Sequence, residues 1–186
     1  EGVHLAADRD GVLHVNRKDY GKTWEEFVFL PRTFAALAKI APSDFVIVIV
    51  TNQSAVNRRQ MTQAVLEDIH ARMLAEIRRA GGRVDAIYFC PHDPAENCDC
   101  RKPKTGMHRR AAREFEIDTA RSYGIGDARV RHLHGGETRI VLHLRQGRLD
   151  PGPQQGHVRF GICDHARNHV RLDACVHLGA LLGDGV

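Results

Sequence analysis

Three cysteines and one histidine lie close together in the segment 90–100 of this sequence. Cys90 and His92 form a C-x-H pair, and Cys98 and Cys100 form a C-x-C pair. Thiolate and imidazole suit a tetrahedral zinc ion, and a closed set of four protein ligands is typical of a structural site rather than a catalytic one. We therefore expect a zinc-binding loop at 90–102. The alternative is a chance grouping, because both pairs are tighter than the commoner C-x-x-C spacing.

Two carboxylates near the start of the chain have the spacing of a nucleophile and its acid/base partner. Asp8 and Asp10 are separated by one residue and followed by Gly11, which permits a sharp turn. An Asp carboxylate can attack a phosphoryl group, which is the role expected of Asp8. Asp10, on the same side of an extended segment, would protonate the leaving oxygen and then activate water. The alternative is that these residues only close a turn.

Further polar residues could stabilise the charge that develops on a phosphoryl group. The hydroxyl of Thr51, backbone N–H groups, Lys102 and a Mg²⁺ ion held by Asp8 and Asp127 would supply donors and positive charge. Taken singly, each has a simpler interpretation: a helix cap at Thr51, a solvated pair at Arg101 and Lys102, a turn acid at Asp127. Their combination favours a single site.

The elements that must position these residues alternate between strand and helix. Continuous β-branched residues at Phe45–Val50 predict a strand buried on both faces, at the centre of a sheet. Thr62 is a good N-cap for a helix that ends at Gly81-Gly82. The other expected strands are Val3–Ala7, Val84–Phe89, Ala120–Ile125 and Thr138–Leu142. One further helix is expected with Pro31 in its first turn, and another at Met107–Phe115.

This alternation predicts a three-layer α/β fold with a mostly parallel central sheet and right-handed crossovers. Asp8, Thr51, Cys90 and Asp127 each follow a predicted strand. Ligands of open α/β sheets bind outside the carboxyl ends of the strands, so one site is expected there. The segment 147–168 is rich in Gly, Pro, Gln and His and is expected to be loop, before an apolar segment at 172–182.

These motifs resemble the haloacid dehalogenase (HAD) superfamily of phosphatases. The resemblance rests on the segments 8–11, 51–54, 90–103 and 126–127, and the metal loop with its Arg-Lys-Pro ending is the most specific part. Within the superfamily they resemble the zinc-loop branch that includes D-glycero-D-manno-heptose-1,7-bisphosphate phosphatase and histidinol-phosphate phosphatase. The resemblance implies a Rossmann-like HAD fold without a large cap. It also implies Mg²⁺-dependent phosphomonoester hydrolysis.

The resemblance also implies roles for individual residues. Asp8 is the nucleophile and Asp10 the acid/base, while Thr51 and Lys102 stabilise the phosphoryl group. Mg²⁺ is gathered by Asp8, Asp10 and Asp127. The residues implied to contact or border the substrate are Asn16, Tyr20, Asn52, Gln53, Ser54, Arg58 and Arg101. Ser54 and Arg58 favour the heptose bisphosphate branch.

One departure from the family lies just after Asp127. The family places a polar residue and then a further acid there, whereas this chain has Ala128 followed by Arg129-Val130-Arg131. The leading hypothesis is a sugar-bisphosphate phosphatase. Histidinol phosphate and nucleic-acid 3′-phosphate ends are alternative substrates of the same mechanism. A zinc-stabilised binding module that has lost activity is the alternative of a different class.

Composition and length set the remaining expectations. The chain has 186 residues, 42% of them hydrophobic, which suits one domain spanning 1–186. Its net charge of +4 comes from Lys and Arg spread along the chain, so a small anionic substrate is favoured over nucleic acid. Cys163 and Cys175, outside the metal loop, are expected to stay reduced in a cytoplasmic protein. We expect a monomer, with no membrane span and no secretion leader.

Overall fold

The computed structural model describes residues 4–17, 19–118, 122–126, 140–144 and 160–162. The elements, in chain order, are β1 (His4–Ala7), α1 (Thr33–Ile40), β2 (Val46–Asn52), α2 (Gln63–Arg79), β3 (Ala86–Cys90), the short 3₁₀ helix η1 (Pro94–Glu96), α3 (Gly106–Glu114), β4 (Tyr123–Gly126), β5 (Ile140–Leu144) and β6 (Phe160–Ile162). Within these ranges, loops and single helices connect the strands, and there is no separate cap domain. None of the helices that the structure describes has the length and apolar character to cross a bilayer.

The strands form one sheet in the order β3-β2-β1-β4-β5-β6, in which only β6 is antiparallel to its neighbour. The predicted α/β fold with a mostly parallel sheet is confirmed. The expectation that Phe45–Val50 lies at the centre of the sheet is wrong. Strand β2 has a neighbour on each side, but β1 and β4 form the middle pair. A buried apolar run indicates an interior strand and cannot give its position in the order.

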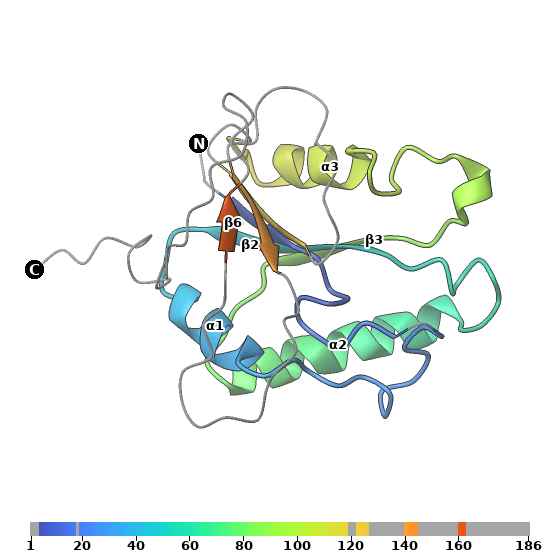
Figure 1. Ribbon diagram of the computed structural model, residues 1–186, viewed down its shortest axis with the longest axis horizontal. Helices are drawn as coiled ribbons and strands as arrows, with labels where there is room; N and C mark the ends of the chain where they lie inside the picture. Colours follow the sequence, from blue (N-terminus) through green and yellow to red (C-terminus); the bar gives the residue numbers. More distant parts are fainter. Residues whose placement is uncertain (1–3, 18, 119–121, 127–139, 145–159, 163–186) are drawn as a thin grey trace, which may run out of the picture.

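Helices cover both faces of the sheet, which gives the three predicted layers (Figure 1). On one face, α1 and α2 bury a cluster that includes Leu37, Ile69 and Met73 against Ile47 and Ile49 of β2. On the other face, α3 packs Met107 and Ala111 against Val48 and Val50. Alternate residues of β2 therefore serve opposite cores, as the period of two in a strand requires.

The helix ends follow the sequence signals in part. The Thr62 side chain caps α2 by accepting a hydrogen bond from Val65 N at 3.2 Å, and Gly81, at φ 81°, follows its last turn. Helix α1 begins at Thr33, so Pro31 precedes its first turn rather than lying within it. Strand β6 falls inside the predicted loop 147–168, because a strand of three residues leaves no periodic pattern. The apolar segment 172–182 lies outside the described residues.

A buried histidine in β1 provides a test of this core. His4 is 5% exposed, and neither ring nitrogen has a hydrogen-bond partner among the described residues. Burial lowers the pKa of His4 from 6.5 to about 4. Between these values the unfolded chain binds more protons than the folded one. The stability that comes from keeping His4 neutral is therefore present above pH 6.5 and lost as the pH falls toward 4.

We expect His4→Leu to remove this pH dependence, because leucine fills the site without titrating. Between pH 7.5 and 5 the free energy of unfolding of the parent should fall about 2 kcal/mol further than that of the variant. Urea titrations at a series of pH values measure the difference. Parallel pH profiles for the two proteins would contradict the buried neutral histidine.

Candidate active site

The predicted site residues meet at one edge of the sheet because their strands are parallel. Asp8 follows β1 directly, Thr51 and Asn52 are the last two residues of β2, and Cys90 is the last residue of β3. The carboxyl ends of these strands lie side by side, which confirms the predicted convergence of three segments. Asp127 follows β4 in the sequence but lies outside the described residues, as do the departures at 128–131.

Asp8 is paired with Lys102 across this edge. Lys102 Nζ lies 2.5 Å from Asp8 Oδ2 and also donates to the carbonyl oxygen of Val50 at 2.7 Å. Burial raises the pKa of Asp8, and the ammonium group of Lys102 opposes that rise. A carboxylate next to one ammonium group and partly open to solvent is placed to meet an anionic substrate.

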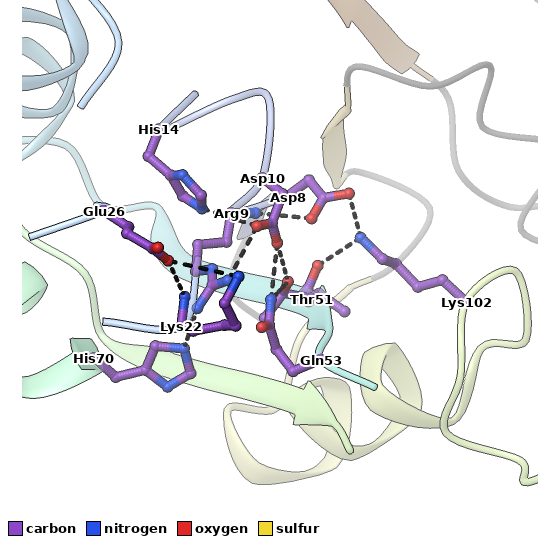
Figure 2. A network of polar contacts seen from close by, with 11 residues as sticks. Asp8, Arg9, Asp10, His14, Lys22, Glu26, Thr51, Gln53, His70 and Lys102 are labelled. Carbon is purple, nitrogen blue, oxygen red and sulfur yellow. Dashed lines mark hydrogen bonds and ion pairs between the residues drawn. The ribbon is translucent and has the colours of Figure 1, made fainter. Parts of the chain in front are cut away.

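Asp10 is held by donors on both of its oxygens (Figure 2). Oδ1 lies 3.0 Å from Arg9 Nη2 and 2.8 Å from His14 Nε2. Oδ2 accepts from Thr51 Oγ1 at 2.9 Å and from Gln53 Nε2 at 2.8 Å. Burial alone would raise the pKa of Asp10, but the hydrogen bonds and charges of His14 and Arg9 outweigh it and hold the pKa well below its usual range.

Arg9 extends this network to helix α2. Its side chain is buried, and Nη1 lies 3.2 Å from Nε2 of His70. Burial, followed by the charge of Arg9, lowers the pKa of His70 to about 3, so His70 is neutral and accepts from the guanidinium group. The sequence analysis missed Arg9, His14 and His70. Arg9 lies within the motif and His14 four residues after Asp10, so both were close enough to be suspected, whereas His70 is 61 residues from Arg9.

The side chains that follow Thr51 form hydrogen bonds within the protein. Asn52 Nδ2 donates to the carbonyl oxygen of Lys102 at 3.1 Å, and Lys102 N donates to Asn52 Oδ1 at 3.0 Å. Gln53 is 2% exposed and bonds Asp10 and Thr51, and Ser54 is also buried. In the structure Asn52 thus fixes the backbone of Lys102, and its substrate contact stays a prediction, as do those of Gln53 and Ser54.

The other predicted substrate residues lie on loops around the edge. Arg58 Nε bonds Asp93 Oδ2 at 2.9 Å, and Arg101 Nη1 donates to the carbonyl oxygen of His92 at 3.1 Å. Both guanidinium groups therefore lie against the metal loop. Tyr20 packs on a small apolar cluster beside the loop that follows β2, and Asn16 is exposed.

The predicted metal ligands gather into one cluster. The Sγ atoms of Cys90, Cys98 and Cys100 lie 3.2 to 3.5 Å apart, and His92 Nδ1 lies 3.5 Å from Cys90 Sγ and 3.2 Å from Cys100 Sγ. Ligands at about 2.0 to 2.3 Å from a common ion lie roughly 3.5 to 3.8 Å apart at tetrahedral angles. The four donor atoms thus suit one tetrahedral ion in their chemistry, and all of them lie within 4.8 Å of one another, with the five pairs above slightly closer than ligands of a bound ion would be.

The metal loop has its own local supports. Asp93 and Glu96 form a capping box around η1, and Asn97 takes the left-handed conformation that ends it. Gly106 lies so close to the backbone of Asp99 that a Cβ there would be 2.4 Å from the Asp99 carbonyl oxygen. Only glycine lets the start of α3 approach the loop in this way.

Comparison with known proteins agrees with this geometry. A family model described as polynucleotide kinase 3 phosphatase matches residues 6–165. The D-glycero-beta-D-manno-heptose-1,7-bisphosphate 7-phosphatase of Pseudomonas aeruginosa is 38% identical over 67% of this chain and 70% of its own length. The Pseudomonas putida protein of the same name is 40% identical over 67% of this chain and 71% of its own length.

A solved structure also matches. The crystal structure of D,D-heptose 1,7-bisphosphate phosphatase from Bordetella bronchiseptica, complexed with magnesium and phosphate, superposes with a TM-score of 0.65. Its sequence is 38% identical, and the match covers 68% of this chain and 71% of that protein. The chain therefore belongs to the polynucleotide kinase 3 phosphatase family, among the HAD phosphatases whose motifs it carries.

Proposed function

We propose that the protein is a Mg²⁺-dependent phosphomonoester hydrolase that acts through an aspartyl-phosphate on Asp8. The observation that carries this proposal is the placement of Asp8 beside Lys102, with Asp10 held two residues further on by Thr51 and its neighbours. The carboxylate of Asp8 attacks phosphorus, and the ammonium group of Lys102 and the hydroxyl of Thr51 stabilise the charge on the phosphoryl oxygens.

The roles of Asp10 and of the metal follow from the same arrangement. Asp10 gives a proton to the leaving oxygen and later takes one from the water that cleaves the aspartyl-phosphate. Asp8, Asp10 and Asp127 would hold Mg²⁺, which would supply positive charge against the repulsion between the carboxylate and the phosphate. The carboxylate of Asp8, partly open at the strand end, offers oxygen ligands of the kind that this ion prefers, whereas both oxygens of the Asp10 side chain are held by protein donors.

The proposed substrate is a sugar bisphosphate such as D-glycero-D-manno-heptose 1,7-bisphosphate. The names of the relatives support it, and Arg58 and Arg101 beside the metal loop offer cations for a second phosphate. Histidinol phosphate stays an alternative. A nucleic-acid 3′-phosphate end is the other alternative, which the description of the matching family favours.

A phosphate-release screen separates these substrates. The purified protein with Mg²⁺ is assayed on heptose 1,7-bisphosphate, histidinol phosphate and a 3′-phosphorylated DNA end. We expect the largest kcat/KM for the bisphosphate. A preference for the DNA end would move the assignment to nucleic-acid repair chemistry, and no release from any substrate with Mg²⁺ would favour the binding-module hypothesis.

We further propose that Cys90, His92, Cys98 and Cys100 hold one structural zinc ion. Their closed set leaves no open position for a substrate. The ion would fix the loop that ends in Arg101 and Lys102, and so the cation that faces Asp8. A site made of reduced thiols fits the reducing cytoplasm.

We expect Cys98→Ser to lose zinc and to destabilise the protein by roughly 3 kcal/mol or more, because ligand binding and loop folding are coupled. Elemental analysis and thermal unfolding measure the two effects. Cys163→Ser, which removes a thiol outside the loop, is the matched control and should keep its zinc. Protein purified without chelators that contains no zinc would rule out the site.

The nucleophile is tested by two isosteric substitutions. Asp8→Asn should abolish turnover but leave folding and substrate binding largely intact, because an amide cannot form the acyl phosphate. Asp10→Asn should still be phosphorylated and should turn over slowly, roughly 10²- to 10⁴-fold below the parent, because it lacks proton transfer. A base-labile phosphoenzyme should accumulate in the Asp10 variant only. Near-normal turnover in both variants would exclude the aspartyl mechanism.

A further inference from the structure

His14 is a buried side chain that reaches back to the acid/base carboxylate. It is 1% exposed, and Nε2 lies 2.8 Å from Asp10 Oδ1. The short turn through Gly11, at φ 75°, brings the two residues together, with Gly11 N donating to the carbonyl oxygen of His14 at 2.8 Å. The His14 ring packs against Phe27 at 4.3 Å between centroids, which fixes its plane.

Among the described residues, the polar contact of the His14 ring is its hydrogen bond to Asp10. Nδ1 is buried and has no partner among them. A ring with Nδ1 as the unprotonated nitrogen carries its proton on Nε2, which is the donor that a carboxylate requires. The N–H at Nε2 therefore satisfies Asp10 Oδ1, while Nδ1 makes no hydrogen bond to any described residue.

The two oxygens of Asp10 differ in how replaceable their donors are. Oδ1 is held by Arg9 and His14, both about 1% exposed, and no substrate can displace them. Oδ2 is held by Thr51 and Gln53 at the strand edge where the substrate phosphate is proposed to bind. When the Thr51 hydroxyl turns to a phosphoryl oxygen, Oδ2 loses one donor while Oδ1 keeps both.

We propose that His14 is a positioning residue that anchors Oδ1, so that Oδ2 is the oxygen that exchanges protons; this inference rests on the proposed phosphatase function. With substrate bound and the Thr51 hydroxyl turned away, Oδ2 takes a proton from solvent; in the first step the bond from phosphorus to the leaving oxygen breaks, its electron pair stays on that oxygen, and this proton moves there. In the second step Oδ2 takes a proton from the water that attacks phosphorus, and the bond to Asp8 breaks. His14 exchanges no proton in either step and fixes the direction in which Oδ2 points.

The test compares two leaving groups. A poor leaving group such as an alkoxide needs the proton from Asp10, whereas 2,4-dinitrophenolate leaves without one. His14→Phe keeps an aromatic ring against Phe27 and removes the donor. In the zinc- and Mg²⁺-loaded protein it should lower kcat/KM about 10- to 100-fold on an alkyl phosphomonoester and less than about threefold on 2,4-dinitrophenyl phosphate, because kcat/KM reports the steps up to loss of the leaving group and leaves out the hydrolysis of the aspartyl-phosphate that both esters share.

Two amide variants refine the test and cover the case in which His14→Phe does not fold. His14→Gln places a donor where Nε2 lies and should restore most of the lost rate, whereas His14→Asn is similar in polarity but too short to reach Oδ1. His4→Leu is the control for loss of a buried histidine outside the site, and it should affect neither substrate. Thermal unfolding confirms that each variant is folded.

The outcomes separate this inference from the proposed function. An equal loss of kcat/KM on both substrates, or equal kcat/KM for the Gln and Asn variants on the alkyl ester, would show that His14 only supports the fold and would overturn the inference. An active parent with an unaffected His14→Phe variant would overturn it as well. A parent that hydrolyses neither ester with Mg²⁺ would overturn the phosphatase assignment itself, and the inference with it.

Discussion

Two carboxylates with one residue between them, at the buried end of a strand, set the main constraint on this protein. Asp8 and Asp10 lose hydration on folding and repel each other, as the raised pKa of Asp8 reflects in part. Such charges persist only where donors and cations replace the water. The donors come from the loop after β1, the end of β2 and the loop before α3. The packing of these segments therefore offsets the cost of placing two acids close together.

The two acids have different sets of partners, and this difference matches the chemistry proposed for each of them. Asp8 has one ammonium partner and stays partly open, so a phosphoryl group can approach it. Asp10 is about as open, with 26% of its side chain exposed against 21% for Asp8, but four donors fix its orientation. Proximity and orientation account for a large share of catalytic rate enhancement, and they require this kind of fixed second carboxylate. The network through Arg9 to His70 extends that rigidity to helix α2.

Much of this could be predicted from the sequence, and the remainder has a physical explanation. The run at 45–50, the cap at Thr62 and the cysteine spacing are local signals, so the strand, the helix and the grouping of Cys and His side chains were each predicted correctly. The contacts of His70 and Gln53 with the motif at 8–10 join positions 61 and 43 residues apart. Such pairs leave no local pattern, because they depend on how α2 and β2 pack.

The two faces of the sheet are closed in different ways. Helices α1 and α2 cover one face with an apolar core that ordinary chain packing provides. The other face is covered by α3, which joins the metal loop at Gly106, where its backbone touches Asp99, and which buries Met107 and Ala111. Because the loop also presents Cys98 and Cys100 to this second core, loss of the zinc ion proposed for the loop would loosen one half of the molecule before the other. Metal supply would then govern how long the protein survives proteolysis in a cell, independently of how strongly its larger core is packed.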